Sequence, residues 1–213
     1  MDKLLPKFSD SLFDKEIADK CVDLAGLSID TVLDIATNTH IPIVSLLVGV
    51  GKVAQNIYDR NLLRQTIHFI YSFNNGTISE EKLQKHRRRL EKDSHRFEDE
   101  LGRIVTLLNS IIDTEKSEML AKLYRAYINE EINWELFCEL SDILSRIFIS
   151  DINFLLETKK QSFKEKGTHN YRVERLRSLG LVNSSVKDIY PGSASYYIST
   201  NELGNKFCDI MLS

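Results

Sequence analysis

Basic side chains recur between residues 82 and 96 at a spacing that suits one face of a helix. Five of them are three or four residues apart, which places them on one broad face: Lys85, Arg88, Arg89, Lys92 and Arg96. Such a face could bind an acidic protein, the backbone of a nucleic acid or the headgroups of a lipid layer. Acidic residues follow closely, at Glu91, Asp93 and 98–100. Pairing within the helix, which would leave only a solvated face, is therefore the alternative.

A second basic group lies near the carboxyl terminus. It consists of Arg172, Arg175 and Arg177 on or beside a short expected helix, and Lys187 in the strand pair that follows. Arg172 and Arg175 share a face because they are three residues apart, whereas Arg177 points elsewhere. Contacts between these side chains and phosphate groups would give salt-sensitive binding of DNA. The alternative is that this segment serves packing or dimerisation.

The segment that carries this second group has a defined order of expected elements. Residues 171–182 predict a short helix that ends at Gly180 and passes into a strand. Residues 185–190 and 196–199 predict a hairpin around a Pro-Gly-Ser turn, and residues 200–207 open a closing helix. Helix, wing and helix in this order resemble the back half of a winged-helix module. Two further helices of the usual length, which a complete helix-turn-helix would need, do not fit between residues 150 and 170. The resemblance also does not by itself indicate DNA binding, because shared folds host many functions.

Residues suited to catalysis are scattered along the chain. His86 and His95 are nine residues apart, too far to share a metal ion on one helix face, and no zinc-protease, nucleophile-elbow or phosphate-loop motif is found. The three cysteines, Cys21, Cys138 and Cys208, form neither a disulfide framework nor a C-x-x-C pair, which favours buried free thiols in a reducing compartment. The sequence therefore predicts no enzyme, no cofactor, no metal site and no small-molecule substrate.

Composition narrows the class of protein further. The chain has 213 residues, of which 42% are hydrophobic and 28% charged, and only three prolines and nine glycines, which favours helices. Its formal net charge of -3 counts against a dedicated nucleic-acid binder, although a local basic patch is compatible with it. The amino terminus lacks the pattern of a secretory signal, so we expect a cytoplasmic protein.

Helical periodicity predicts the elements that must position both basic groups. Amphipathic stripes recur over residues 1–158, which we expect to form a multi-helix body. Residues 159–169 are polar and contain a glycine, as is typical of a linker, and residues 170–213 are expected to form the winged-helix-like module. The predicted fold class is mainly α, with a small α+β module at the carboxyl terminus. The first basic group is expected on a single helix that continues past Glu100.

The most apolar stretch of the chain covers residues 41–50. Continued to the first charge at Lys52, it makes about twelve helical residues, which at about 1.5 Å each span roughly 18 Å. A bilayer core is about 30 Å thick, so this stretch is too short to cross a membrane alone. A buried core helix is one interpretation, and a helix lying in the membrane interface is the other.

Short motifs from residue 41 onward resemble a known group of proteins. The residues that carry the resemblance are Ile41-Pro42-Ile43-Val44, Tyr58-Asp59-Arg60 with Leu62-Leu63, the run from Lys122 to Ile128, Ser150-Asp151, and the runs 179–182 and 203–207. They are similar to uncharacterised bacterial helical proteins that are loosely related to abortive-infection alpha proteins. The resemblance implies a helical fold and a context of phage defence or mobile elements, and it carries no functional residue over to this chain.

These observations predict a non-enzymatic interaction or regulatory protein of the cytoplasm. A protein partner is the first expectation, and a homodimer is compatible with the strongly amphipathic helices. One alternative is a DNA-binding regulator that uses the carboxyl-terminal module. The other is a membrane-associated effector that uses residues 41–50 beside the basic helix.

Overall fold

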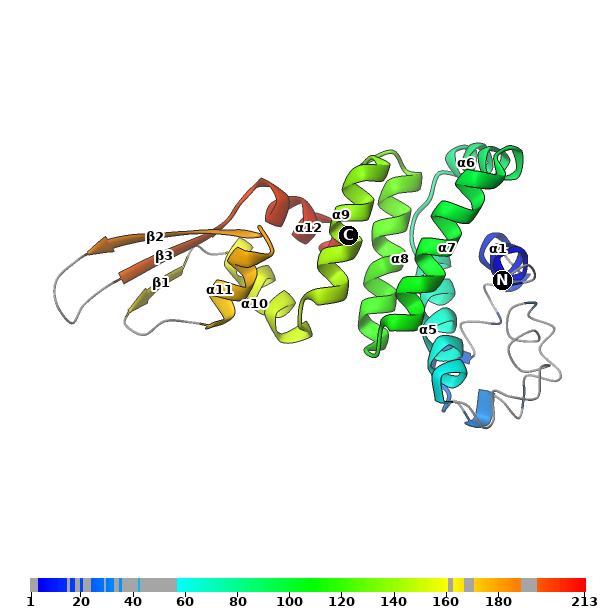
Figure 1. Cartoon of the computed structure of the whole chain (residues 1–213), viewed down its shortest axis with the longest axis horizontal. Helices are drawn as coiled ribbons and strands as arrows, with labels where there is room; N and C mark the ends of the chain where they lie inside the picture. The colour runs from blue at the N-terminus through cyan, green and yellow to red at the C-terminus, as the bar shows by residue number, and fades with distance from the viewer. Residues whose placement is uncertain are drawn as a thin grey trace. The chain divides into compact units, whose positions relative to one another are not determined.

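A computed structural model describes most of the chain as two compact units, Met1–Phe137 and Cys138–Ser213 (Figure 1). The described residues are 4–14, 16, 17, 20, 24–28, 30–32, 35, 42, 57–160, 163–166, 171–188 and 195–213. The apolar stretch 41–50 lies outside the described residues, apart from position 42. Among the helices that are described, none combines the length and the apolar character that crossing a membrane requires.

The first unit is helical. Its helices are α1 (Leu4–Phe13), α5 (Ile57–Asn74), α6 (Glu80–Lys92), α7 (Ser94–Ser110) and α8 (Thr114–Ile128), and α9 (Trp134–Arg146) begins in it. Helix α5 packs against α8 and α7, and α1 packs against α7 and α5. Figure 1 shows α5 behind α7, with α1 on the far side of α7 from α8.

Aromatic rings fill the core of this first unit. The ring centroids of Phe8 and Phe69 are 5.8 Å apart, those of Phe73 and Tyr124 are 5.7 Å apart, and those of Tyr124 and Phe137 are also 5.7 Å apart. All five side chains are fully buried. Because large aromatic side chains remove the most apolar surface from water, these contacts fix the positions of α1, α5, α8 and the first turn of α9.

The basic segment does not form the single helix expected from the sequence. Asp93 has φ -130° and ψ 98°, which is extended backbone, and it separates α6 from α7. Its backbone N–H donates to the carbonyl of Leu90 at 3.3 Å, while its carboxylate accepts from the backbone N–H of Arg96 at 3.1 Å. Aspartate is a preferred residue before the first turn of a helix because its side chain satisfies a free N–H there. Arg96 consequently belongs to α7 rather than to the face formed by the other four basic residues.

The second unit joins helices to a small antiparallel sheet. Its elements after α9 are α10 (Ile149–Lys160), β1 (Phe163–Lys166), α11 (Tyr171–Ser178), β2 (Val182–Asp188), β3 (Ser195–Thr200) and α12 (Glu202–Leu212). The strand order is β1-β3-β2, with Phe163 opposite Ile198 on one side and Ser184 opposite Ile198 on the other. The hairpin after α11 and the closing helix α12 confirm the predicted fold class, a mainly helical chain with a small winged-helix-like module.

Two details of this unit differ from the sequence-based expectation. Residues 163–166, predicted as part of a linker, form strand β1, and α10 runs to Lys160. Along the chain, the boundary between the two compact units falls between residues 137 and 138, within α9, and not near residue 158. Strand β1 is a four-residue edge strand with three charged residues, and such edges resemble loops in composition because charge protects them from pairing with other chains.

Glycines permit two tight features where α11 meets β2 and α12. Gly180 has φ +72°, the left-handed conformation that commonly ends a helix, and the next residue, Leu181, donates its N–H to the carbonyl of Leu176 at 3.0 Å. A Cβ atom on Gly204 would lie 2.0 Å from the carbonyl oxygen of Leu181. The first turn of α12 therefore approaches the backbone more closely than any residue with a side chain would allow.

Candidate functional site

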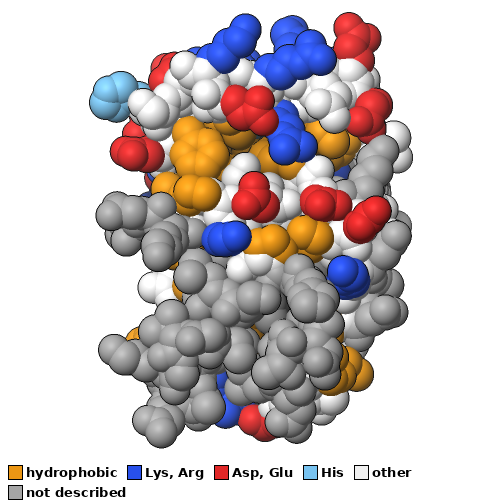
Figure 2. Space-filling view, turned by 90° about the vertical axis from the view of Figure 1, so that its right-hand side faces the viewer, with side chains coloured by type: hydrophobic (Ala, Val, Ile, Leu, Met, Phe, Trp, Pro, Cys, Tyr) orange, Lys and Arg blue, Asp and Glu red, His pale blue; other side chains and the backbone are white. Residues whose placement is uncertain are grey.

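Helix α6 presents cations to solvent that its own acidic residues do not neutralise. Arg88 and Lys92 are exposed, and neither has an ion-pair partner among the described residues. The nearest acidic residue of the helix, Glu91, accepts instead from Arg87 at 3.1 Å. Figure 2 shows Lys and Arg side chains gathered at the top of the view, with a few acidic side chains between them. The self-paired face considered in the sequence analysis therefore accounts for Arg87 and for Arg96, which pairs with Glu100, and it leaves Arg88 and Lys92 available.

Two hollows flank α6. The outer hollow has a volume of about 720 Å³ and is lined among the described residues by Glu81, Gln84, Lys85, Arg88, Arg89, Lys92 and Asp93. The inner hollow has a volume of about 600 Å³ and lies between α6, the start of α7 and the turn that joins α8 to α9. Lys85 and Arg89 line both hollows, so the two share a cationic wall.

The inner hollow combines cationic and aromatic side chains. Its cations are Lys82, Lys85, Arg89 and Arg96, and its aromatic side chains are Tyr127 and Trp134. The Trp134 ring lies 5.4 Å from the Tyr127 ring, measured between centroids, whereas Arg89 Nη2 donates to the Tyr127 hydroxyl at 3.2 Å. The tryptophan therefore stands beside the ring of Tyr127 and the arginine at its hydroxyl end.

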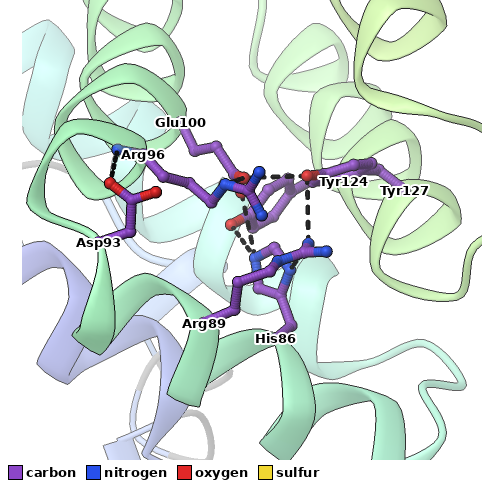
Figure 3. A network of polar contacts seen from close by, with 7 residues as sticks. All are labelled: His86, Arg89, Asp93, Arg96, Glu100, Tyr124 and Tyr127. Carbon is purple, nitrogen blue, oxygen red and sulfur yellow. Dashed lines mark hydrogen bonds and ion pairs between the residues drawn. The ribbon is translucent and has the colours of Figure 1, made fainter.

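A buried polar network supports this hollow (Figure 3). The Tyr127 hydroxyl donates to Glu100 Oε1 at 2.9 Å, and Glu100 Oε2 lies 3.2 Å from His86 Nε2. Arg96 Nε is 3.8 Å from Glu100 Oε1. Figure 3 shows Arg89 from α6 and Arg96 from α7 extending toward the same Tyr127–Glu100 pair. Glu100 and His86 are 2% and 3% exposed, so the charge that organises the two arginines is shielded from water.

The contacts of His86 assign the proton on its ring. Arg89 Nη2 lies 2.8 Å from His86 Nδ1, and a guanidinium can only donate, so Nδ1 accepts. The proton of the neutral ring is then on Nε2, which faces the Tyr124 hydroxyl at 3.0 Å and Glu100. Both ring nitrogens are thus engaged inside the core, and this histidine is placed to orient Arg89.

Burial and negative charge act together on the two tyrosines. Desolvation, followed by the nearby charge of Glu100, raises the pKa of Tyr127 to about 12. The same two causes, in the same order, raise the pKa of Tyr124 well above its usual range. Both hydroxyls are therefore protonated at neutral pH, and the Tyr127 hydroxyl can act as a donor to Glu100.

The turn between α8 and α9 closes the other side of the inner hollow. Glu130 has φ 60°, a left-handed conformation that is uncommon for residues other than glycine, and its carboxylate accepts from Lys85 Nζ at 2.9 Å. That hydrogen bond lowers the pKa of the Glu130 carboxyl. Lys82 Nζ donates to the carbonyl of Asn129. Two lysines of α6 thus hold the turn, whereas the arginines face the hollow.

The predicted cations of the carboxyl-terminal module have different surroundings. Arg175 binds Asp151 with both branches, at 2.7 Å from Nε and 2.6 Å from Nη2, and Arg172 Nε lies 3.4 Å from the same carboxylate. Asp151 is 1% exposed. Arg177 is exposed on α11, and Lys187 belongs to β2 with its side chain outside the described part. Two of the four predicted phosphate ligands are therefore engaged with a buried acid.

Apart from His86, no histidine and no cysteine of the described residues lines either hollow. No group of three or more His, Cys, Asp or Glu side chains suited to a metal ion occurs among the described residues. His68 pairs with Glu118 at 2.9 Å, and His95 is exposed. Cys208 is buried and Cys138 half-buried, and burial raises the pKa of the Cys208 thiol to about 11. Cys21, His40 and His169 lie outside the described residues.

Sequence reasoning missed the second half of the site. Glu100 was expected to pair within the helix, as it does with Arg96, but its burial and its contact with Tyr127 were not predicted, nor was the place of Trp134 in the inner hollow. One signal was available for Glu100, because it lies four residues after Arg96 and beside Leu101 on the apolar side of α7. Nothing in the sequence relates Trp134 to Arg89.

The inner hollow places most of its charged side chains as cations on one surface. Four cations line an open concave surface together with Glu131 and with Glu130, which is paired with Lys85, while the imidazole of His86 is engaged with Tyr124 and Arg89. Comparison of the chain with protein-family models, with curated proteins and with solved structures found no match.

Proposed function

We propose that this chain is a non-enzymatic binding protein of the cytoplasm that docks an acidic protein partner on the outer face of α6. The outer face is defined here by Lys85, Arg88 and Lys92 around the outer hollow. The observation that carries the proposal is the exposure of Arg88 and Lys92 without ion-pair partners among the described residues. Unneutralised cations beside a hollow attract a surface of opposite charge and direct its approach.

Mixed charge in the outer hollow favours a protein partner over a nucleic acid. Glu81 and Asp93 line the hollow together with its cations. A phosphate backbone is uniformly negative and would be repelled by these carboxylates, whereas a protein surface can place cations opposite them. The net charge of -3 favours the same choice. The resemblance to proteins loosely related to abortive-infection alpha proteins suggests a partner from bacterial phage defence or a mobile element.

Charge reversal of the outer face tests this proposal. The unaltered chain is expected to capture a partner from its host. We expect the double variant Arg88→Glu/Lys92→Glu to capture at least about tenfold less of this partner, because two attractive contacts become repulsive. The measurement is quantitative mass spectrometry of captured proteins, with and without nuclease, at two salt concentrations. Reversal of exposed cations elsewhere, Lys7→Glu/Arg64→Glu, is the control and should leave capture unchanged.

Two outcomes would contradict the proposal. Capture that survives reversal of Arg88 and Lys92 would exclude the outer face as the docking surface. Capture that disappears on nuclease treatment would show that a nucleic acid, and not a protein surface, is recognised.

The two alternatives have weaker support. DNA binding by the carboxyl-terminal module would rest on Arg177 and Lys187, because Arg172 and Arg175 contact Asp151. Membrane association would rest on residues 41–50, which lie outside the described residues apart from position 42. Homodimerisation stays a prediction, and the partner captured in the experiment above would then be a second copy of this chain.

A further inference from the structure

We propose that the inner hollow is a binding site for a nucleoside phosphate, with the phosphate on Arg89 and Arg96 and the flat ring beside Trp134. This proposal is independent of the proposed function: a nucleoside phosphate could bind in the inner hollow whether or not a protein docks on the outer face of α6. The inference rests on three observations: unused guanidinium donors, an adjacent aromatic wall and a volume of suitable size.

The donors that suit a phosphate belong to Arg89 and Arg96. Arg89 uses Nη2 for His86 and Tyr127, while its Nε is buried and has no hydrogen-bond partner among the described residues. Its Nη1 also has no hydrogen-bond partner among the described residues and, unlike Nε, is not buried, so an anion in the hollow can accept from it. Arg96 reaches Glu100 only at 3.8 Å, beyond hydrogen-bond distance. Two planar guanidinium groups offer more donors than one carboxylate can accept, which favours a phosphate with three terminal oxygens.

An aromatic wall stands next to these donors. Trp134 is half-buried, and no hydrogen bond of its indole N–H to a described residue is found. Ile128, Ile132 and Leu136 also line the hollow. Aromatic side chains bind the flat faces of nucleobases, and this contact is tolerant of the base because every base has such a face. Asn133 uses its side-chain oxygen for the N–H of Leu136 at 2.8 Å, so its amide group keeps donors for a ring edge.

The size of the hollow fits such a ligand. Its volume of about 600 Å³ lies within the range of roughly 300–1,000 Å³ that is typical of small-molecule sites. The buried contacts of Arg89 with His86 and Tyr127 hold one guanidinium in place before a ligand arrives, and such preorganisation lowers the entropy lost on binding. Two acids line the hollow: Glu130 is paired with Lys85, which limits its repulsion of a phosphate, and Glu131 is exposed to solvent, which screens its charge.

Trp134 makes the proposal directly measurable, because it is the single tryptophan of the chain. We expect ADP to change Trp134 fluorescence in a saturable way, with the same affinity by isothermal titration calorimetry of the full chain. Adenosine and pyrophosphate, which each carry one half of the recognised chemistry, should bind at least about tenfold more weakly than ADP. Arg96→Gln should weaken ADP binding at least about tenfold, and Trp134→Phe should weaken it in the calorimeter.

The matched control is Arg87→Gln, which removes a cation of the same helix that lines neither hollow. It should leave ADP binding unchanged, and circular dichroism should show equal helix content in all variants. Absence of saturable ADP binding at millimolar concentration overturns the proposal. Equal affinity for pyrophosphate and ADP also overturns it, since the site would then recognise a bare anion. Equal weakening by Arg87→Gln and Arg96→Gln would reduce the effect to general electrostatic attraction and would overturn it as well.

Discussion

At the level of single residues, a polar network occupies part of an otherwise aromatic core. Glu100 is buried: its Oε1 accepts from Tyr127, whereas its Oε2 lies 3.2 Å from His86 Nε2 and has no hydrogen-bond partner among the described residues. Removing one member of such a network costs more than the hydrogen bond itself, because the remaining groups stay buried without partners. The network thereby gives Arg89 a fixed position in the inner hollow.

The two tyrosines of the network predict a dependence of stability on alkaline pH. The folded state holds the Tyr127 proton up to about pH 12, whereas an ordinary tyrosine loses it near 10. A raised pKa in the folded state means that its stabilising effect is complete below pH 10 and is lost as pH rises toward 12. We therefore expect the free energy of unfolding to fall over this range, and tyrosinate absorbance to lag behind that of the unfolded chain.

Tyr127→Phe should separate this effect from general alkaline denaturation. At neutral pH the variant should be less stable by about 1–3 kcal/mol, because Glu100 loses a donor. Its disadvantage should shrink above about pH 10, where the unaltered chain begins to lose the benefit of its bound proton. Tyr71→Phe, at a half-exposed position, serves as the control in the same urea titrations. A stability difference between the Tyr127→Phe variant and the unaltered chain that stays constant from neutral to strongly alkaline pH would contradict this account.

At the level of elements, two helix ends position the functional side chains. Asp93 ends α6 and begins α7, which brings Arg96 toward the Tyr127–Glu100 pair that Arg89 approaches from α6. In the second unit, the left-handed Gly180 and the cap Asn201, whose side chain accepts from the N–H of Gly204 at 2.9 Å, direct β2 and α12. In both places a short polar or glycine residue sets the angle between elements.

The close approach of α12 to β2 predicts a strong effect of Gly204→Ala. The added methyl group would lie 2.0 Å from the carbonyl oxygen of Leu181, and a backbone atom cannot move aside as a flexible side chain can. We expect a loss of about 1–3 kcal/mol in the free energy of unfolding, measured by urea denaturation. Gly26→Ala, where nothing lies within 4 Å of the new Cβ, is the control and should be near neutral. A Gly204→Ala variant as stable as the unaltered chain would show that the approach is looser than described.

At the level of the whole molecule, the chain consists of two compact units, each with its own buried core. The first carries both hollows, and the second carries the winged-helix-like module with the buried Asp151. Arg175, which binds this buried acid, also packs against two aromatic rings: its Cζ lies 5.0 Å from the ring centroid of Phe148 and 4.8 Å from that of Tyr171. Arginine in the module is thus part of its packing.

Asp151→Asn should loosen one unit while leaving the other intact. The substitution removes the charge that binds Arg172 and Arg175, so we expect faster amide hydrogen exchange throughout residues 138–213. Amides of α5 and α8 should keep their protection, because their contacts lie within the first unit. Glu157→Gln, at an exposed position of α10, is the control for loss of a charge. Equal acceleration in both units would indicate that the chain unfolds as a single cooperative block.

Local order in the amino-acid sequence was enough to predict much of the fold. Hydrophobic periodicity predicted a helical body, glycine and turn residues predicted the hairpin and its flanking helices, and basic spacing predicted the face of α6. These features follow from neighbours within a few residues of each other, where propensity, capping and turn chemistry act. The unpaired state of Arg88 and Lys92 was not among them, because it depends on where the side chain of Glu91 turns.

Which residues form a site became evident only from the packing of the helices. Trp134 and Tyr127 join Arg89 because α8, the following turn and α6 pack together, and no pattern in the chain relates residues that lie so far apart in sequence. The same holds for Asp151, which reaches across 24 positions to Arg175 and changes an expected DNA ligand into a packing element. Local sequence sets dihedral angles and faces, whereas contacts between distant residues come from the burial of those faces against each other.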